Sequence, residues 1–447
     1  MVDVDGWLLR TAFLAGLAGA CGERSTLDGP KPHAQGATTG GTTMGVSPTA
    51  PNSNVSGSPA SGSSPNSAGT LGTGGSSVST GTSDSGGQVG SGGTTNTGSQ
   101  VGLSIANGLD HTCVVMPSGT IKCWGANSSG QLGDATTTAS LAPVTVRNIT
   151  SATQITAGHQ YSCALLEDRT VRCWGGNSWH QLGNNSTIDS SIAVTVSGVS
   201  NASAIASGAM HSCAIVAGQI YCWGHTSYAY ANPKPGEGSA TALPVGGVTS
   251  AIAVACGGDH TCALQADGLV QCWTYYPSNQ LGSGVPNFTP LVIGNLSDAV
   301  AISAGSLHTC AALSDGSVRC WGFNMNGTLG VGNETFSSEI ALQAVGLSQV
   351  IGITSGSGHN CALLTDGTVR CWGSNNYGEL GNGTTTSSYV PVQVLGLTRV
   401  TALSRASMHT CSGFVDGSIL CWGHNVSGQL GDGTRNDSGV PVAVLGL

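Results

Sequence analysis

Cysteine and histidine are the residues of this chain whose types and spacing point to chemistry. Fourteen of the sixteen cysteines form seven pairs, and the first cysteines of successive pairs lie 50, 50, 49, 48, 51 and 50 residues apart. In six repeats a histidine stands two residues before the first cysteine: His111, His211, His260, His308, His359 and His409, with Tyr161 at that place in the other. Such residues can form disulfides, remain buried thiols, or bind a metal ion.

Each cysteine pair fits a β-hairpin. If Cys361 lies opposite Cys371, Thr365-Asp366-Gly367 becomes a three-residue loop with glycine at the position that needs positive φ. The third repeat is one residue shorter and leaves the two-residue loop Ala217-Gly218, whereas the second has Arg169 at the glycine position. Opposed cysteines are close enough to bond, so we expect the disulfides Cys113–Cys123, Cys163–Cys173, Cys213–Cys222, Cys262–Cys272, Cys310–Cys320, Cys361–Cys371 and Cys411–Cys421.

The alternatives for these cysteines are buried thiols and zinc, which needs four ligands at each site. Equivalent positions in different repeats are held apart, so the repeated histidines do not predict a metal site. We expect them to be structural and bonded to nearby backbone, and we expect the repeated Trp to pack between repeats. Cys256 stands outside the pattern and is expected to be a buried thiol outside the disulfides.

Elsewhere the sequence offers little chemistry. Four acids occupy hairpin turns, where Asp bonds the local backbone: Asp267, Asp315, Asp366 and Asp416. No paired acids, nucleophile elbow or phosphate loop stands out. We therefore predict no catalytic residues, no metal and no cofactor.

The repeat period predicts the fold. Each unit of about fifty residues contains four short strands, as in the sixth repeat at 350–355, 360–364, 368–372 and 390–395. Seven such units indicate an all-β, seven-bladed β-propeller over residues 101–447, preceded by a disordered N-terminal segment. A β-solenoid is the alternative, although shorter repeats are expected for it.

The repeat resembles a known family. Its last copy reads His409-Thr-Cys-Ser-Gly-Phe-Val-Asp-Gly and then Trp422-Gly-His-Asn-Val-Ser-Gly-Gln-Leu-Gly. This pattern is similar to the regulator-of-chromosome-condensation repeat, in an exported bacterial form with two added cysteines per repeat. The resemblance covers 101–447 and implies a seven-bladed propeller. One relative exchanges nucleotide on a nuclear GTPase, and another is a secreted inhibitor that caps a β-lactamase with one face.

Composition restricts the partners. The chain has 447 residues, 70 of them Gly, with 8 % charged residues and a formal net charge of −9. Nothing here suits a polyanion-binding surface, so no nucleic-acid partner is predicted. Patterned cysteines indicate an oxidising compartment, which is wrong for guanine nucleotide exchange beside chromatin.

The N-terminus indicates export. An apolar run from Thr11 to Ala20 ends at Cys21 and has the length of a signal core. Leu17-Ala-Gly-Ala-Cys21 resembles a bacterial lipobox, which implies a signal peptide over 1–21 and lipidation of Cys21. Ala18 and the acids Asp3 and Asp5 depart from that pattern, so plain secretion and an unprocessed N-terminus are the alternatives. Residues 22–100 are rich in Gly, Ser and Thr and predict a disordered tether.

Specificity in a symmetric scaffold has to come from the repeats that differ. The loops after Trp174, Trp223 and Trp273 carry unusual aromatic residues, and we expect a ligand-binding sector that contains Trp179, His180, Tyr228, Tyr230, Tyr275 and Tyr276. Ordinary loop packing is the alternative. The sequence thus predicts a non-catalytic binding or scaffold protein for a protein or glycan partner. It is expected as a bacterial lipoprotein at the cell surface or in the periplasm, anchored to a membrane only through Cys21, or otherwise as a secreted protein. An extracellular hydrolase or lyase with a site in the central channel is the other hypothesis.

Overall fold

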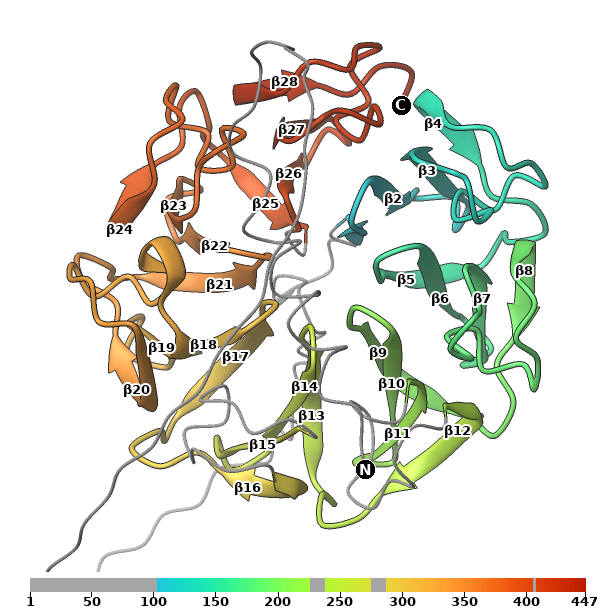
Figure 1. The fold of residues 1–447 in the computed structure, drawn as a ribbon, viewed down its shortest axis with the longest axis horizontal. Helices are drawn as coiled ribbons and strands as arrows, with labels where there is room; N and C mark the ends of the chain where they lie inside the picture. Colours follow the sequence, from blue (N-terminus) through green and yellow to red (C-terminus); the bar gives the residue numbers. More distant parts are fainter. Residues whose placement is uncertain (1–102, 226–237, 275–286, 405–406) are drawn as a thin grey trace, which may run out of the picture. The chain divides into compact units, whose positions relative to one another are not determined.

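A computed structural model describes residues 103–225, 238–274, 287–404 and 407–447. Within these ranges the chain forms seven antiparallel sheets of four strands, arranged as blades around a central axis (Figure 1). Blade 1 contains β1 to β4, and each later blade contains the next four strands, up to β25 to β28 in blade 7. The all-β, seven-bladed propeller expected from the repeat period is therefore confirmed.

The strands take four places in each blade. The innermost are β1 (Ile105–Asn107), β5 (Ala152–Ala157), β9 (Ala202–Ser207), β13 (Ala251–Cys256), β17 (Ala299–Ala304), β21 (Val350–Ser355) and β25 (Val400–Leu403). The second are β2 (His111–Val115), β6 (Tyr161–Leu166), β10 (His211–Val216), β14 (His260–Gln265), β18 (His308–Leu313), β22 (His359–Leu364) and β26 (His409–Phe414).

The third strands are β3 (Ile121–Gly125), β7 (Val171–Gly175), β11 (Gln219–Gly224), β15 (Val270–Thr274), β19 (Val318–Phe323), β23 (Val369–Gly373) and β27 (Ile419–Gly423). The outermost are β4 (Ser140–Thr145), β8 (Ser190–Thr195), β12 (Ser239–Val245), β16 (Asn287–Val292), β20 (Ser337–Gln343), β24 (Ser388–Gln393) and β28 (Ser438–Ala443). In the described residues a single 3₁₀ turn, η3 (Met325–Gly327), accompanies them, and no helix has the length and apolarity to span a membrane.

The predicted hairpin register is confirmed. Cys361 lies directly opposite Cys371, and Gly367 has φ 75° in the turn between them. The short third hairpin turns at Ala217 and Gly218, both at positive φ. Arg169 adopts φ 61° at the position where the other hairpins carry glycine, a backbone conformation that is uncommon for a residue with a side chain. In the sixth repeat β24 begins two residues before the predicted strand.

The structure contains all seven predicted disulfides, Cys113–Cys123, Cys163–Cys173, Cys213–Cys222, Cys262–Cys272, Cys310–Cys320, Cys361–Cys371 and Cys411–Cys421. Each joins the second strand of a blade to the third, with Cα atoms 4.0–4.1 Å apart. All fourteen of these cysteines are fully buried. The bridges therefore lie in the core of the propeller and hold each hairpin closed.

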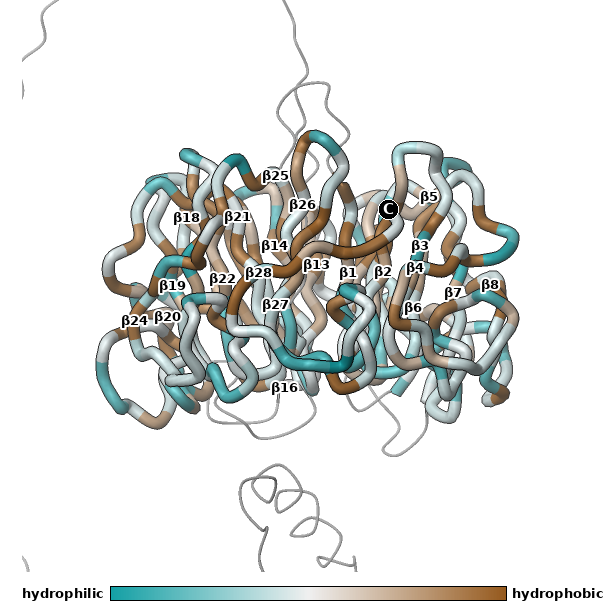
Figure 2. The backbone as a smooth tube through the Cα atoms, turned by 90° about the horizontal axis from the view of Figure 1, so that it is seen from above, coloured by the Kyte–Doolittle hydropathy of each residue, from teal (hydrophilic) through white to brown (hydrophobic). Residues whose placement is uncertain are grey.

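The core lies between neighbouring blades. Seven tryptophans fill it, each buried to 1 % exposure or less: Trp124, Trp174, Trp223, Trp273, Trp321, Trp372 and Trp422. Trp174 of blade 2, for example, packs with Ile121 and Leu132 of blade 1. The predicted packing of tryptophan between repeats is confirmed. Viewed on edge, the strands run between two faces of the propeller, and several hydrophilic stretches lie in the loops at those faces (Figure 2).

Candidate functional site

One face of the propeller is built from two kinds of loop. Because the strands of a blade alternate in direction, the turn between its first and second strands emerges on the same side as the loop between its third and fourth strands. We call this side the loop face. Asp110, in the turn before β2, and His424, directly after β27, meet on it across neighbouring blades.

The longer loops are held by an asparagine that follows the Trp-Gly pair. In blade 1, Asn127 Oδ1 accepts a hydrogen bond of 2.9 Å from the Leu132 backbone N–H, and its amide donates to the carbonyls of Thr136 and Thr138. The same asparagine–leucine bond occurs at Asn177, Asn324, Asn375 and Asn425. The asparagine and the following leucine are therefore structural residues, and they fix the residues between them in space.

The repeated histidines join one blade to the next. The Nε2 atom of each bonds to the side chain that precedes the first cysteine of the following blade, at 2.7–2.9 Å: His111–Ser162, His211–Thr261, His260–Thr309, His308–Asn360, His359–Thr410 and His409–Thr112. In blade 2 the Tyr161 hydroxyl bonds to Ser212 instead. The structural role is confirmed, but the expected backbone partner is wrong, because the neighbouring blade brings a closer side chain.

Tryptophan completes this contact. Trp174 Nε1 donates to the Gln131 carbonyl of blade 1 at 2.9 Å, and the Ser162 hydroxyl donates to the same oxygen. Equivalent bonds from tryptophan reach the previous blade at Trp124, Trp223, Trp372 and Trp422. The repeated residues of the motif are thus occupied in holding blades together, and a ligand site must be sought among the residues that vary.

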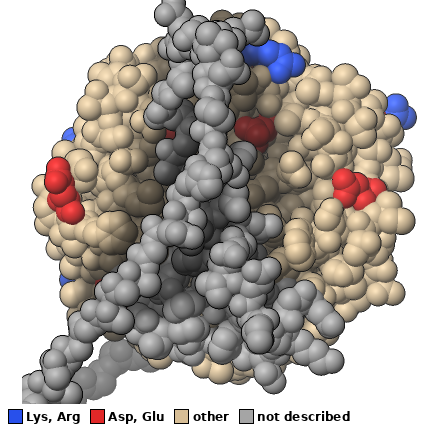
Figure 3. Space-filling model, viewed as in Figure 1, with Lys and Arg blue, Asp and Glu red and all other residues tan. Residues whose placement is uncertain are grey.

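The mouth of the central channel on the loop face is lined by small residues. Those that the structure describes are Gly, Ala and Ser from the turns before each second strand, joined by Asn107, Leu109 and His159. No carboxylate belongs to this described lining. Figure 3 shows that charged side chains are also sparse over the visible part of one face. The described channel mouth therefore shows no converging acids of the kind that glycoside hydrolysis uses.

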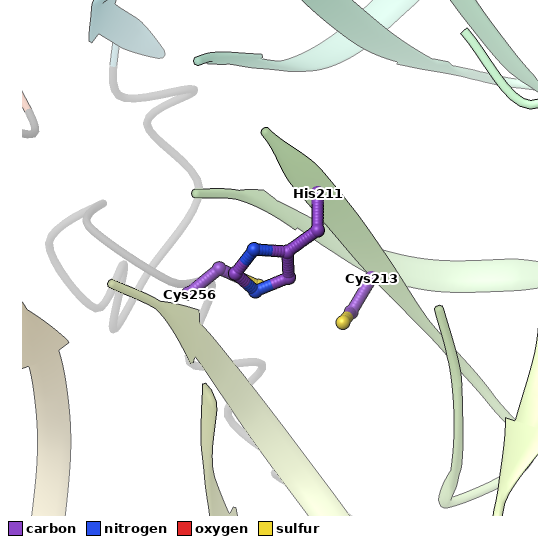
Figure 4. A group of neighbouring side chains, drawn as sticks. All are labelled: His211, Cys213 and Cys256. Carbon is purple, nitrogen blue, oxygen red and sulfur yellow. The ribbon is translucent and has the colours of Figure 1, made fainter. Parts of the chain in front are cut away.

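A cluster with the composition of a metal site lies between blades 3 and 4. His211, Cys213 and Cys256 gather there, all three buried (Figure 4). Cys213 is bonded to Cys222, however, so its sulfur is not a thiolate ligand. His211 and Cys256 alone fall short of the four ligands of a structural zinc site. Cys256 itself is a buried thiol outside the disulfides, as expected.

The aromatic sector predicted from the sequence is described in part. Trp179 lies in the loop after β7 and is 38 % exposed. Its ring meets that of His225 in blade 3 edge-on, with centroids 4.6 Å apart. A large, partly exposed aromatic side chain supported from the next blade is suited to contact a partner. Tyr228, Tyr230, Tyr275 and Tyr276 lie outside the described residues.

His180, beside Trp179, occupies an unusual backbone conformation. Its φ is 63°, and the equivalent residues of blades 1, 5, 6 and 7 are glycines at φ 81–87°: Gly130, Gly327, Gly378 and Gly428. A Cβ at Gly130 would lie 2.6 Å from the Ser191 backbone of the next blade. A Cβ added at Gly238 of the next blade would lie 2.7 Å from His180 Cδ2, so glycine at that position leaves room for the imidazole ring. Strained residues of this kind often mark functional sites. The loop after β7 therefore departs from the repeat in two ways, through the exposed Trp179 and the strained His180.

A second aromatic–histidine pair was not predicted. Tyr377 stands at the same repeat position as Trp179, and its ring lies 4.4 Å from that of His424 in the next blade. The sequence could have indicated this pair, because Tyr377, like Trp179, is aromatic at a position where other repeats have Ser129 and Ser427. The two pairs place aromatic side chains at two separate points on the loop face.

Acidic groups surround the second pair. His424 Nδ1 lies 3.7 Å from Asp110 Oδ1, and Gln429 donates to both side chains. Burial lowers the pKa of His424, but the hydrogen bond to Asp110 and the nearby carboxylates outweigh this effect and raise it. Burial raises the pKa of Glu379. The described part of the loop face around Tyr377 therefore carries several ionisable side chains.

Two family models match the sequence, both described as the regulator of chromosome condensation (RCC1) repeat. One matches residues 103–131, 152–181, 251–273, 299–328 and 350–379, and the other matches 118–165, 170–215, 366–412 and 416–447. Together they cover more than half of the chain. Among curated proteins no match was found.

Solved structures share the fold. Yeast RCC1 (Prp20) bound to Kap60 superposes with a TM-score of 0.64 at 20 % identity, over 77 % of this chain and 84 % of that one. A second structure, of Prp20p from Saccharomyces cerevisiae, superposes with a TM-score of 0.64 at 20 % identity, over 78 % of this chain and 87 % of that one. Human WBSCR16 superposes with a TM-score of 0.61 at 22 % identity, over 70 % of this chain and 86 % of that one. At these identities the likeness concerns the fold alone.

Proposed function

Because this chain belongs to the regulator of chromosome condensation (RCC1) repeat family, we propose that it is a non-catalytic binding or scaffold protein that holds its partner on the loop face. The partner is a protein or a glycan. The contact site is the sector of blades 2 to 4 that begins with Trp179 and His180. From the sequence we include Tyr228, Tyr230, Tyr275 and Tyr276 in this site, and these residues lie outside the described ranges.

The observation that carries the proposal is the exposure of Trp179. The seven repeated tryptophans are buried to 1 % exposure or less, whereas Trp179 presents 38 % of its surface beside His225. Aromatic residues of this kind dominate the energetics of protein interfaces when a partner buries them. The strained His180 beside it is a second reason to place the site there.

Relatives of the same fold support a protein partner. In yeast, the structure of Prp20 is known bound to Kap60, and Prp20p has binding properties to Gsp1p and histones. The present chain has a formal net charge of −9 and seven buried disulfides. These features favour a partner outside the nucleus, in an oxidising compartment, and no nucleic acid.

The test is capture of the partner by the full chain. Proteins and glycans are collected from the surface of the source cells with wild-type protein and with a variant that carries Trp179→Ala, Tyr228→Ala and Tyr275→Ala. The variant is expected to lose capture while its melting temperature stays nearly unchanged. Retained capture together with a lowered melting temperature would show that these residues pack the loops and that the site lies elsewhere.

The location is tested separately. We propose that the chain is exported, with lipid on Cys21 and residues 22–100 as a tether. Cys21→Ala is then expected to move the protein from the membrane fraction to the soluble fraction. A wild-type protein that is already soluble after export would contradict the anchor without affecting the binding proposal.

A further inference from the structure

One thiol lies beside a disulfide inside the described part of the propeller. Cys256, the last residue of β13, is 1 % exposed and faces blade 3. Its Sγ donates to the Ala206 carbonyl at 3.6 Å. Ala206 in β9 is the direct pairing partner of Cys213 in β10. This contact places the thiol of blade 4 next to the disulfide of blade 3.

A histidine completes the cluster. The Sγ atoms of Cys256 and Cys213 and a ring nitrogen of His211 all lie within 4.8 Å of one another. Figure 4 shows the His211 ring directed into the space between the two cysteines. Cys256 supplies a thiol that becomes a nucleophile when it loses its proton, Cys213 supplies a disulfide sulfur, and His211 supplies a base. These are the components of thiol–disulfide exchange, in which a thiolate attacks one sulfur of a disulfide and displaces the other.

We propose that Cys256, His211 and the Cys213–Cys222 disulfide form an internal thiol–disulfide exchange site. The Cys256 thiol gives its proton to His211, and its Sγ attacks Cys213 Sγ. The Cys213–Cys222 bond breaks as the Cys213–Cys256 bond forms, and Cys222 leaves as a thiolate and takes up the proton. The number of disulfides and thiols is unchanged, so the step needs no oxidant or reductant.

The surroundings keep the reaction inside the molecule. Cys213, Cys222 and His211 are fully buried, so thiols in solution do not reach them in the folded state. The β10–β11 hairpin keeps its backbone pairing when the bond moves. The new bond joins blade 3 to blade 4 and closes a much longer loop than the hairpin bond, and longer loops gain more from a crosslink. Exchange therefore converts a bond within one blade into a bond between two.

The five other blades in which the structure describes the equivalent residue cannot react in this way. The residues equivalent to Cys256 are Asn107, Ala157, Ser207, Ala304 and Ser355. None of them offers a sulfur nucleophile, although each lies near a disulfide of the same geometry. Five disulfides of the same protein therefore serve as internal controls for the Cys213–Cys222 disulfide.

The experiment uses the full oxidised chain. Protein is incubated without reductant at pH 6 and at pH 8.5, quenched in acid, unfolded, labelled with a maleimide and digested without reduction. Mass spectrometry then reports the labelled cysteine and the linked pairs. At pH 8.5 we expect label on Cys222 and a Cys213–Cys256 link to accumulate at least tenfold faster than at pH 6. Label that stays on Cys256 alone at both pH values would overturn the proposal.

Two variants separate the roles. Cys256→Ser is expected to abolish the label on Cys222 and to leave Cys213–Cys222 intact, and label on Cys222 in this variant would show that exchange does not need Cys256. His211→Gln is expected to slow exchange more at pH 7 than at pH 9, where hydroxide replaces the base. An equal rate in wild type and His211→Gln at pH 7 would remove His211 from the mechanism. If that variant fails to fold, the pH dependence of the wild type still decides the exchange itself.

Discussion

His409 of the last blade and Thr112 of the first blade share a hydrogen bond of 2.7 Å between Nε2 and Oγ1. The Thr112 hydroxyl donates its own hydrogen to the Gln429 carbonyl at 2.8 Å, so it accepts from the histidine. Within the described ranges each blade consists of four consecutive strands, and no described strand is exchanged between the first blade and the last. This seam is therefore closed by side-chain contacts of the same kind that join blades linked through the chain.

Thr112→Val is expected to open the seam. The substitution removes both hydrogen bonds and leaves His409 Nε2 unpaired in the core, which costs about 1–3 kcal/mol. The Gln429 carbonyl keeps the hydrogen bond from Trp124 Nε1. Hydrogen exchange should accelerate in β1, β2 and β26. The matched control is Thr309→Val, which removes the equivalent bond to His260 between blades 4 and 5. It should lower the free energy of unfolding in urea by a similar amount without the local effect at the seam. Equal exchange at the seam in both variants would contradict the prediction.

Acid is expected to destabilise the propeller. Burial lowers the pKa of His111 and His308 to about 4 and that of His359 and His409 to about 3. The unfolded chain binds protons near pH 6.5 while the folded chain does not, so stability is full above that value and falls as the pH drops towards 3–4. Each histidine contributes a slope of about 1.4 kcal/mol per pH unit in this window.

Urea unfolding between pH 7.5 and pH 4.5 measures this slope. His359→Gln keeps a side chain that can bond to Thr410 and should reduce the slope by the share of one histidine. A free energy of unfolding that stays constant over this range would show that the histidines are not buried in neutral form.

Trp179→Ala is expected to weaken partner binding by about 2 kcal/mol or more, which is a loss of roughly thirtyfold in affinity. Tyr377→Ala is the matched control, because Tyr377 occupies the same repeat position in blade 6 and also contacts a histidine of the next blade. Titration of the captured partner with both variants measures the difference. A larger loss for Tyr377→Ala would move the site to blades 6 and 7.

Gly238→Ala is expected to displace the His180 loop. A Cβ at this position would lie 2.7 Å from His180 Cδ2 and 3.0 Å from the Trp179 carbonyl. Overpacking of this kind costs about 1–3 kcal/mol. His180→Gly in the same protein removes the contact with the imidazole ring and the positive-φ strain, so it should raise the melting temperature towards the wild-type value.

Gly246→Ala is the control for this pair, since a Cβ there meets no atom within 4 Å. It should leave the melting temperature unchanged. If His180→Gly fails to rescue Gly238→Ala, the two residues do not compensate each other.

The local structure of this protein was determined by the sequence alone. The hairpin places Cys361 opposite Cys371, and the turn needs a residue with positive φ at Gly367. Both features depend on contacts within about ten residues of the chain, where strand pairing and turn chemistry leave few alternatives. Repetition of this unit seven times was enough to predict the propeller.

Contacts between blades were decided by the tertiary structure. The sequence showed a repeated histidine, but its partner lies one repeat further along the chain, and His409 finds its partner at the other chain end. The space beside His180 and the sulfur beside Cys213 likewise come from the following blade. No local rule predicts such pairs, because the angle and distance at which blades pack decide which side chains meet.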